Sequence, residues 1–189
     1  MKLAEIVSHS PKWKEEFQSI KAIIVGRLGE AVLQIDHIGS TSIEGLDAKD
    51  CIDIQITVKS FDQLDAVIEG LTDLGYFYRP ENNRDHVPPG WQGDLANWDK
   101  RYFRAGEGMR RTNIHVRKLG MDNQRYALLF RDYLRANKQV ALIYAELKRA
   151  ISQYHSEDIE AYCLIKDPAC DLIMDVAYRW DAGLDKLID

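Results

Sequence analysis

A run of small polar residues follows an apolar segment in the first quarter of the chain, His37-Ile38-Gly39-Ser40-Thr41-Ser42. Gly39 has no Cβ, so the backbone can approach an anion closely. Ser40, Thr41 and Ser42 offer hydroxyl and amide donors at the expected start of a helix, where the dipole also favours negative charge. Such a run is most often a turn with a helix cap. Asp53 on the next strand adds a carboxylate for a hard cation and favours phosphate binding beside a metal.

A second segment places polar side chains where they can join this site. Residues 110–118 alternate between apolar and polar side chains, and His115 shares the polar face with Asn113 and Arg117. If this strand lies beside the strand that carries Asp53, His115 comes close to that carboxylate. Neutral imidazole is a metal ligand and a proton acceptor near pH 7, so His115 is a candidate auxiliary ligand or base. A lone strand histidine more often has a structural role, and the Arg117 end is expected to be solvated.

Several basic side chains are candidates for phosphate binding, because Arg matches phosphate oxygens bidentately. Arg110 and Arg111 stand at the expected tip of a hairpin whose second strand leads to His115. Arg131 and Arg135 share one face of a later helix. They either clamp phosphate or tie the helix to the sheet through an ion pair, and the second role is the more common. Other cations considered for the same role are Lys49, Lys100, Arg101 and Arg104.

Three segments resemble one known family: IDHIGSTSIEGLDAKDCIDIQITV, RRTNIHVRK and LLFRDYLRANKQVALIYAELKRAI. They are similar to the GrpB-like family of the nucleotidyltransferase superfamily, which also contains DNA polymerase beta, and to the domain found fused to some dephospho-CoA kinases. The resemblance runs from about residue 35 into the C-terminal helices. It implies an α/β (α+β) fold with a nucleotidyltransferase-like mixed, mostly antiparallel sheet, flanking helices and a C-terminal helical extension.

The metal site implied by this resemblance is incomplete. Active members of the superfamily carry Asp-x-Asp on one strand and a third carboxylate on a neighbouring strand, so that two cations about 4 Å apart act together. This chain has Asp53 followed by Gln55, whose carbonyl oxygen is its only ligand atom, and His115 at the third position. The expected metal set is therefore Asp53, Gln55 and His115, with one Mg²⁺ or Mn²⁺ brought in by a nucleotide. Two-metal catalysis is disfavoured.

The hydrophobic pattern predicts the elements that position these residues. Helices are expected near 11–28, 64–74, 123–136 and 138–154, the second opening with a capping box formed by Ser60 and Gln63. A further helix is expected after a Ser156 cap, and a last one from Pro168. Strands are expected at 31–38, 51–58, 100–105 and 110–118, the last two forming a hairpin. The irregular stretch 80–99 is either a lid or binding loop, or a variable surface connection.

Composition bounds the class of protein. The 189 residues, 46% hydrophobic and 29% charged, predict one globular domain over residues 1–189, with a sheet core at about 30–120 and a helical extension at about 121–189. Cys51, Cys163 and Cys170 have neither disulfide nor zinc spacing, and core packing is expected for all three. No signal-peptide pattern or membrane-spanning run is apparent, so a cytoplasmic protein without a membrane partner is expected.

These observations lead to two hypotheses. The first is a nucleotidyltransferase-like protein that binds a nucleotide or another phosphorylated small molecule with Mg²⁺ or Mn²⁺. If it is active, it transfers a nucleotidyl group to a small-molecule or protein hydroxyl, with Asp53 and His115 as catalytic residues. The second is a non-catalytic phosphate-binding accessory module that has lost the metal pair. Nucleic acid is a disfavoured partner, because the formal net charge is -5. The sequence does not determine the nucleotide, the acceptor or the oligomeric state.

Overall fold

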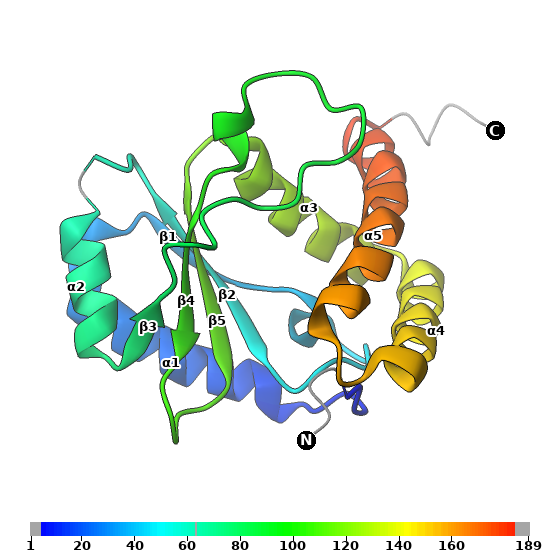
Figure 1. Cartoon of the computed structure of the whole chain (residues 1–189), viewed down its shortest axis with the longest axis horizontal. Coiled ribbons are helices and arrows are strands. Elements are labelled where there is room, and N and C mark those ends of the chain that lie inside the picture. Colours follow the sequence, from blue (N-terminus) through cyan, green and yellow to red (C-terminus); the bar gives the residue numbers. More distant parts are fainter. Residues whose placement is uncertain (1–4, 63, 184–189) are drawn as a thin grey trace.

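The computed structural model describes residues 5–62 and 64–183, and in this part of the chain five strands form one mixed sheet (Figure 1). The strands are β1 (Gln34–Ile38), β2 (Ile52–Val58), β3 (Tyr76–Tyr78), β4 (Arg101–Ala105) and β5 (Thr112–Lys118). The α-helices are α1 (Lys12–Leu28), α2 (Asp65–Asp73), α3 (Asp122–Ala136), α4 (Lys138–His155) and α5 (Ile159–Asp181). Short 3-10 turns lie at Gly29–Ala31, Ser40–Ser42 and Leu95–Trp98.

The strand order β1-β2-β5-β4-β3 brings the two predicted polar strands together. β2 and β5 are parallel, whereas the other neighbouring pairs are antiparallel. The predicted fold class, a mixed and mostly antiparallel sheet with flanking helices, is therefore confirmed. The register places Asp53 opposite Asn113 and Gln55 opposite His115.

The two faces of β2 differ in chemistry, as its alternation predicts. Ile52, Ile54 and Ile56 are fully buried in a core that also contains apolar residues of α1 and α2. The opposite face carries Asp53 and Gln55 and looks toward α3, whose Gln124 carbonyl accepts a hydrogen bond from Gln55. One face of β2 therefore packs in the hydrophobic core, and the polar face is available for a functional site.

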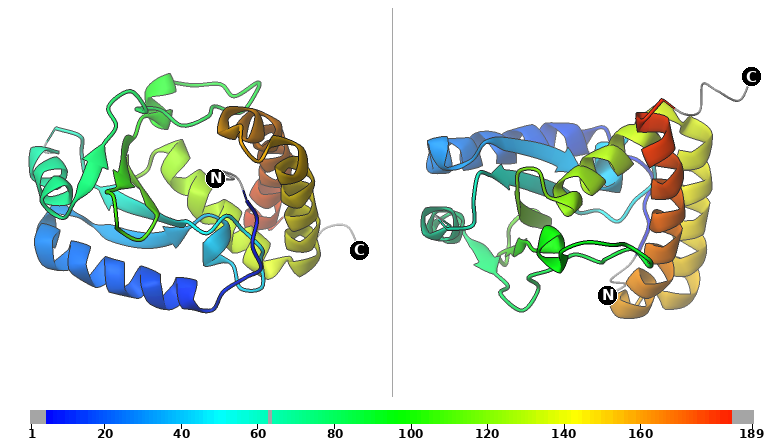
Figure 2. Two further views of the ribbon diagram at one scale, coloured as in Figure 1. Left: turned by 60° about the horizontal axis from the view of Figure 1, so that its bottom comes forward. Right: turned by 90° about the horizontal axis from the view of Figure 1, so that it is seen from above.

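The C-terminal helices form a second apolar cluster beside the sheet (Figure 2). Leu134 of α3 and Tyr144 of α4 pack there with Met174 of α5. Ile43 and Leu46, from the segment after β1, belong to the same cluster and join the helical extension to the site turn. Because α4 and α5 are held at this position, their side chains can face the polar side of β2.

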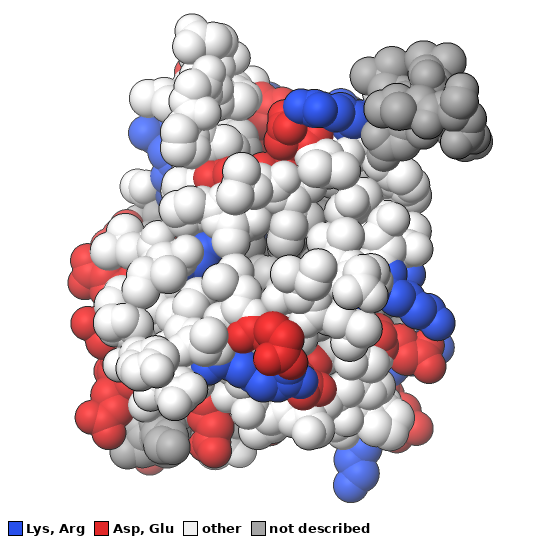
Figure 3. Space-filling view, turned by 90° about the vertical axis from the view of Figure 1, so that its right-hand side faces the viewer, with Lys and Arg blue, Asp and Glu red and all other residues white. Residues whose placement is uncertain are grey.

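The outer surface of this extension carries few charges over its middle (Figure 3). Leu164 and Leu172 of α5 and Ile143 of α4 are exposed apolar residues of these helices. Among the helices of the described ranges, none is both long and apolar enough to cross a membrane.

Some predicted boundaries were wrong. β1 begins at Gln34 rather than residue 31, because a 3-10 turn precedes it. The two helices predicted after Ser156 and from Pro168 are one helix, α5, with Asp158 as its N-cap and Pro168 in its interior. Burial of Cys170, Met174 and Ala177 beyond the proline explains why the helix continues, since tertiary packing outweighs the local cost.

The N-cap predicted at Ser60 was wrong. The Ser60 hydroxyl donates to Asp62, and α2 begins only at Asp65 without a side-chain cap. Gln63 lies outside the described residues.

The irregular segment 80–99 is fastened to the sheet by a largely buried ion network. The Asp85 carboxylate pairs with Lys100 Nζ and Arg117 Nε, each at 2.8 Å, and accepts a third bond from Asn123 of α3. Burial opposes ionisation, but Arg117 and Lys100 hold the pKa of Asp85 well below its usual range. The expectation that Arg117 is solvated was wrong, because this network buries it.

We expect Asp85→Ala to lower the free energy of unfolding by about 3–5 kcal/mol, because it leaves two buried cations unpaired. The matched control is Arg84→Ala, which removes an exposed ion pair with Asp99 and should cost about 1 kcal/mol or less. Urea unfolding measures both. Equal effects of the two substitutions would contradict the structural role of Asp85. Since the folded-state pKa of Asp85 is lowered, its contribution should be present at neutral pH and be lost as the pH falls below about 4.

Candidate functional site

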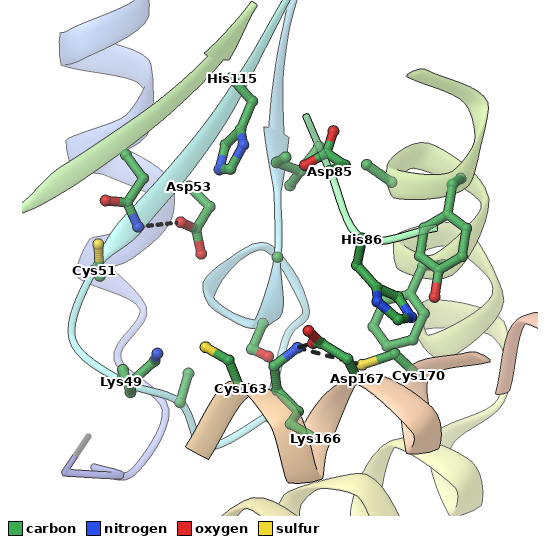
Figure 4. A pocket seen from close by; sticks show the side chains of 18 of the residues that line it. Lys49, Cys51, Asp53, Asp85, His86, His115, Cys163, Lys166, Asp167 and Cys170 are labelled. Atoms are coloured by element: carbon green, nitrogen blue, oxygen red, sulfur yellow. Dashed lines mark hydrogen bonds and ion pairs between the residues drawn. The ribbon is translucent and has the colours of Figure 1, made fainter. Parts of the chain in front are cut away.

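A cavity of about 370 Å³ lies between the polar side of β2 and β5 and the helices α3, α4 and α5 (Figure 4). The turn after β1 and residues of the 80–99 segment complete its wall. Its volume is within the usual range for small-molecule sites. Cys51, Cys163 and Cys170 are free thiols that line it.

The Gly39 turn is pressed against Asp53. Gly39 has a φ of 67°, and a Cβ at this position would lie 2.6 Å from Asp53 Oδ2. Only glycine therefore fits here. The predicted helix after it is a single 3-10 turn of three residues, so no extended helix dipole reinforces the site.

The three hydroxyls of the turn have different roles. Thr41 donates to the Cys51 carbonyl at 3.2 Å and lies 3.0 Å from His37 Nε2. Ser42 donates to the Gly39 carbonyl at 2.6 Å and is not part of the cavity wall. Ser40 lines the cavity. Gly39, Ser40 and Thr41 are therefore the parts of the predicted phosphate turn that line this space, although the Thr41 hydroxyl is already bonded, while Ser42 only holds the turn in shape.

Asp53 points into the cavity and accepts a hydrogen bond from Asn113 Nδ2 at 2.8 Å (Figure 4). Burial raises the pKa of Asp53, and the Asn113 bond, Lys49, Lys166 and Arg111 oppose that shift. Asn113 was identified on the polar face in the sequence but was not predicted as a site residue. The sequence offered its alternation as a signal, and the parallel β2–β5 pairing makes it a neighbour of Asp53.

Gln55 and His115 differ from the expected metal ligands. The Gln55 oxygen accepts from Arg117 at 2.6 Å, its nitrogen donates to the Gln124 carbonyl, and its side chain is fully buried. Its one ligand oxygen is thus already engaged, at odds with the expected metal set. His115 lines the cavity, with Nδ1 3.5 Å from Arg117 Nη2. Because arginine only donates, Nδ1 accepts and the proton is on Nε2.

The charge state of His115 follows from its surroundings. Burial lowers its pKa well below the usual range, and Arg117 and Lys100 lower it further, with Asp85 opposing them. His115 is therefore neutral. Across the described ranges, no group of three or more His, Cys, Asp and Glu side chains is placed to hold a metal ion. The cavity offers Asp53 as the carboxylate that faces the Gly39 turn.

A set of cations converges on the same space from distant parts of the chain, namely Lys49, Arg111, Lys148 and Lys166. Lys49 Nζ lies 4.6 Å from the centre of the Tyr162 ring. Lys148 is buried and donates to the Asp47 carbonyl at 2.6 Å, and Lys166 pairs with Asp167 at 2.6 Å. Burial lowers the pKa of Lys148 to about 7, and Lys166 and Lys49 contribute to that shift.

Sequence reasoning did not identify Lys148 and Lys166 as part of the site. They lie on helices more than 90 residues after Asp53, and no local spacing distinguishes them from other surface lysines. Only the packing of α4 and α5 against α3 and against each other brings them to the cavity.

The predicted arginines separate in space. Arg111 lines the cavity. Arg110 pairs instead with Glu16 at 2.9 Å and with Asp50. Arg131 binds Asp132 and the His37 carbonyl, and it lines a second cleft on the other side of the Gly39 turn. Arg110 and Arg131 are thus not brought to the Asp53 cavity.

The 80–99 segment contributes a hydrogen-bonded group of its own. His86 Nε2 lies 2.8 Å from Asp171 Oδ2 of α5, and the Tyr126 hydroxyl donates to the other oxygen of that carboxylate at 3.0 Å. His86 lines the cavity. Asp85 is bound to the sheet and His86 to α5. The 80–99 segment is thus attached on both sides of the cavity and forms part of its wall.

The chain is similar to one protein family and to several curated proteins. The family described as GrpB protein matches residues 4–176. A dephospho-CoA kinase of Mycolicibacterium paratuberculosis is 35% identical over an alignment 175 residues long, which covers 86% of this chain and 43% of that protein. UPF0157 protein YqkA of Bacillus subtilis is 34% identical over 95% of this chain and 48% of its own length. The chain thus spans less than half the length of these two curated relatives.

Solved structures agree with the fold. The crystal structure of the conserved protein GrpB from Enterococcus faecalis has a TM-score of 0.74 and 30% identity, covering 92% of this chain and 96% of that one. The Cid1 poly(U) polymerase bound to MgATP, as an H336N mutant, has a TM-score of 0.52 at 11% identity, over 85% of this chain and 50% of that one. The scaffold is therefore nucleotidyltransferase-like.

We expect Gly39→Ala to distort the cavity, because the added methyl group meets the Asp53 carboxylate in addition to the strained positive φ. The matched control is Gly45→Ala, which has a φ of 77° and nothing within 4 Å of the added Cβ. Backbone strain at such positions costs about 1–3 kcal/mol, so both variants should lose stability in urea unfolding; Gly39, with a ψ of -175°, lies in a region almost restricted to glycine. Gly39→Ala should lose at least about 1 kcal/mol more, because overpacking adds to the strain. Equal losses would show that the turn does not press on Asp53.

Proposed function

The chain belongs to the GrpB family, and on that premise we propose that its cavity binds a nucleotide polyphosphate together with one Mg²⁺ or Mn²⁺. The observation that carries the proposal is that Lys49, Lys148, Lys166 and Arg111 line the same cavity as Asp53, whereas the other two carboxylates of the wall, Asp85 and Asp167, are already in ion pairs. A chain with a net charge of -5 gathers these cations in one partly enclosed space. A polyphosphate supplies the negative charge that such a cluster attracts.

Different residues of the cavity would contact the phosphates and the nucleoside of the ligand. Lys166 and Arg111 would meet phosphate oxygens, and the Gly39–Ser40 backbone allows a close approach. The aromatic side chains of Tyr126 and Phe130, which also line the cavity, would contact the nucleoside. Both carry apolar ring faces suited to a base.

The residues present fit a divalent cation only if the nucleotide brings most of its ligands. Asp53 supplies one hard oxygen, and Mg²⁺ commonly binds through one or two carboxylates plus substrate phosphates and water. Asn113 orients the Asp53 carboxylate through its hydrogen bond. When bound, the cation would neutralise phosphate charge beside that carboxylate.

Nucleotide binding without turnover is the better supported form of this function. Gln55 is bound to Arg117, and the neutral His115 directs Nδ1 toward the same arginine. The set of oxygen ligands that two-metal transfer needs is therefore reduced to Asp53. The relatives named dephospho-CoA kinase, of which this chain matches less than half, support an accessory role beside a separate catalyst. Nucleotidyl transfer remains the second candidate, supported by the nucleotidyltransferase-like scaffold.

A thermal-shift panel tests the proposal with nucleoside triphosphates, coenzyme A and dephospho-coenzyme A, each with and without Mg²⁺ or Mn²⁺. A ligand at about 100 times its dissociation constant stabilises by about 2.7 kcal/mol, or roughly 5–10 °C in a domain of this size. Lys166→Met should abolish the shift, and Asp53→Ala should abolish its dependence on metal. The control Lys59→Met alters an exposed lysine outside the cavity and should leave the shift intact. No shift with any compound would refute nucleotide binding.

Binding should also depend on pH through Lys148. Its pKa of about 7 means that it is largely protonated at pH 6 and largely neutral at pH 8.5. A bound polyphosphate favours the protonated form, so affinity should fall as the pH rises through this range. We expect a decrease of about threefold to tenfold by isothermal titration calorimetry, since close charges contribute about 1 kcal/mol. Lys148→Met should remove most of the dependence, and an unchanged profile in that variant would exclude Lys148.

A further inference from the structure

A second cleft lies on the other side of the Gly39 turn, between the N-terminal half of α1 and the junction of α3 with α4. Figure 2 shows α1 approaching the segment after β1 and the start of α4. The cleft measures about 1000 Å³, and Asp36, His37 and Thr41 are among its lining residues. Thr41 lines both spaces, so the turn separates this cleft from the Asp53 cavity.

Most of the charged side chains that line the cleft are basic. Five of its residues are Lys or Arg and two are acidic, although the whole chain carries a net charge of -5. The basic residues come from both sides, from α1 and from the α3–α4 junction: Lys14, Lys21, Arg131, Arg135 and Lys138. The acidic residues are Asp36 and Glu44.

Two of these cations hold the cleft together. Lys21 donates to the Ile35 carbonyl at 2.9 Å, and Arg131 donates to the His37 carbonyl at 3.1 Å. Arg131 also lies 3.6 Å from Asp36. These bonds occupy carbonyls of β1, the edge strand of the sheet, and so protect that edge from pairing with another strand.

The remaining cations are available to a ligand. Lys14 and Lys138 form no ion pair within the ranges that the structure describes, and both are exposed. Arg135 uses Nε and Nη2 on the Ser42 carbonyl, while its Nη1 lies 3.5 Å from Asp132 and its side chain is 44% exposed. The neighbouring positive charge also affects His37. Burial lowers the pKa of His37 to about 4, and Arg135 and Arg131 contribute to that shift.

The placement of the cations favours an extended ligand over a single small anion. Lys14 lies on α1 and Lys138 at the α3–α4 junction, so the two exposed cations come from opposite sides of the cleft. An extended peptide places alternate side chains about 7 Å apart on one face, so that successive carboxylates can meet cations from both sides.

We propose that this cleft is a docking site for an acidic peptide segment of a protein partner, distinct from the nucleotide cavity. Lys14 on one side and Arg135 and Lys138 on the other bind its carboxylates. The exposed Leu142 at the start of α4 offers an apolar contact at the rim. Electrostatic contacts of this kind set association rate and specificity, so binding should weaken with added salt.

Fluorescence anisotropy with a fluorescein-labelled octaglutamate peptide tests this site in the full chain. We expect the double variant Lys14→Glu/Lys138→Glu to weaken binding by at least about tenfold, because it turns attraction into like-charge repulsion. The control Lys59→Glu/Lys118→Glu makes the same change in net charge outside the cleft and should weaken binding less than about threefold. Asp53→Ala should leave peptide binding unchanged, which separates this site from the nucleotide cavity.

Three results would overturn the proposal. The first is no binding of the peptide to the unaltered protein at 1 mM. The second is an equal loss in the two double variants, which would mean that only net charge matters. The third is complete displacement of the peptide by an equimolar amount of inorganic pyrophosphate, which would identify a site for a small anion. Circular dichroism of each variant confirms that the fold is retained.

Discussion

The Asp85 carboxylate is the group on which the cavity wall depends. It lies in an irregular segment, yet it binds Lys100 before β4, Arg117 of β5 and Asn123 of α3. Removing such a group from water costs several kcal/mol, and the cost is offset only when charged partners surround it. Arg117 extends the same network to Gln55 of β2. The segment is therefore bound to the sheet and to α3 at once, and His86 beside Asp85 is placed against α5.

The same network explains why Asp53 and Gln55, which share the polar face of β2, have different roles. Gln55 satisfies Arg117 and Gln124, so it belongs to the framework, whereas Asp53 two residues earlier meets Asn113 and the cavity. Alternation puts both side chains on one face, but their neighbours on β5 give them different roles. A carboxylate at position 55 would lie against the buried Arg117 and would form an ion pair with it.

Much of the fold and part of the site could be predicted from the sequence. Period-two alternation identified β2 and β5, and glycine with a following carboxylate identified the turn against Asp53, because both signals are local. The roles of Asp85, Lys148 and Lys166 could not be predicted, since each depends on packing between segments far apart in the sequence. Pro168 shows the opposite failure. Its local signal for a helix start was clear, but packing of α5 residues on both sides of it was stronger.

The Gly39–Ser42 turn is best understood as a rigid partition between two basic spaces. Gly39 has no room to move toward Asp53, Thr41 is bonded to the Cys51 carbonyl and lies beside His37, and Ser42 closes the turn on itself. Arg135 fixes the far end of the turn through the Ser42 carbonyl. The carbonyls of Gly39, Ser40 and Ser42 thus have partners before any ligand arrives. Such preorganisation lowers the entropic cost of binding, because the groups that meet the ligand are already held in place. The sequence run that first suggested phosphate binding therefore acts mainly through shape: Gly39 and Ser40 line the cavity, Ser42 lines the second cleft, and Thr41 lies between the two spaces and lines both.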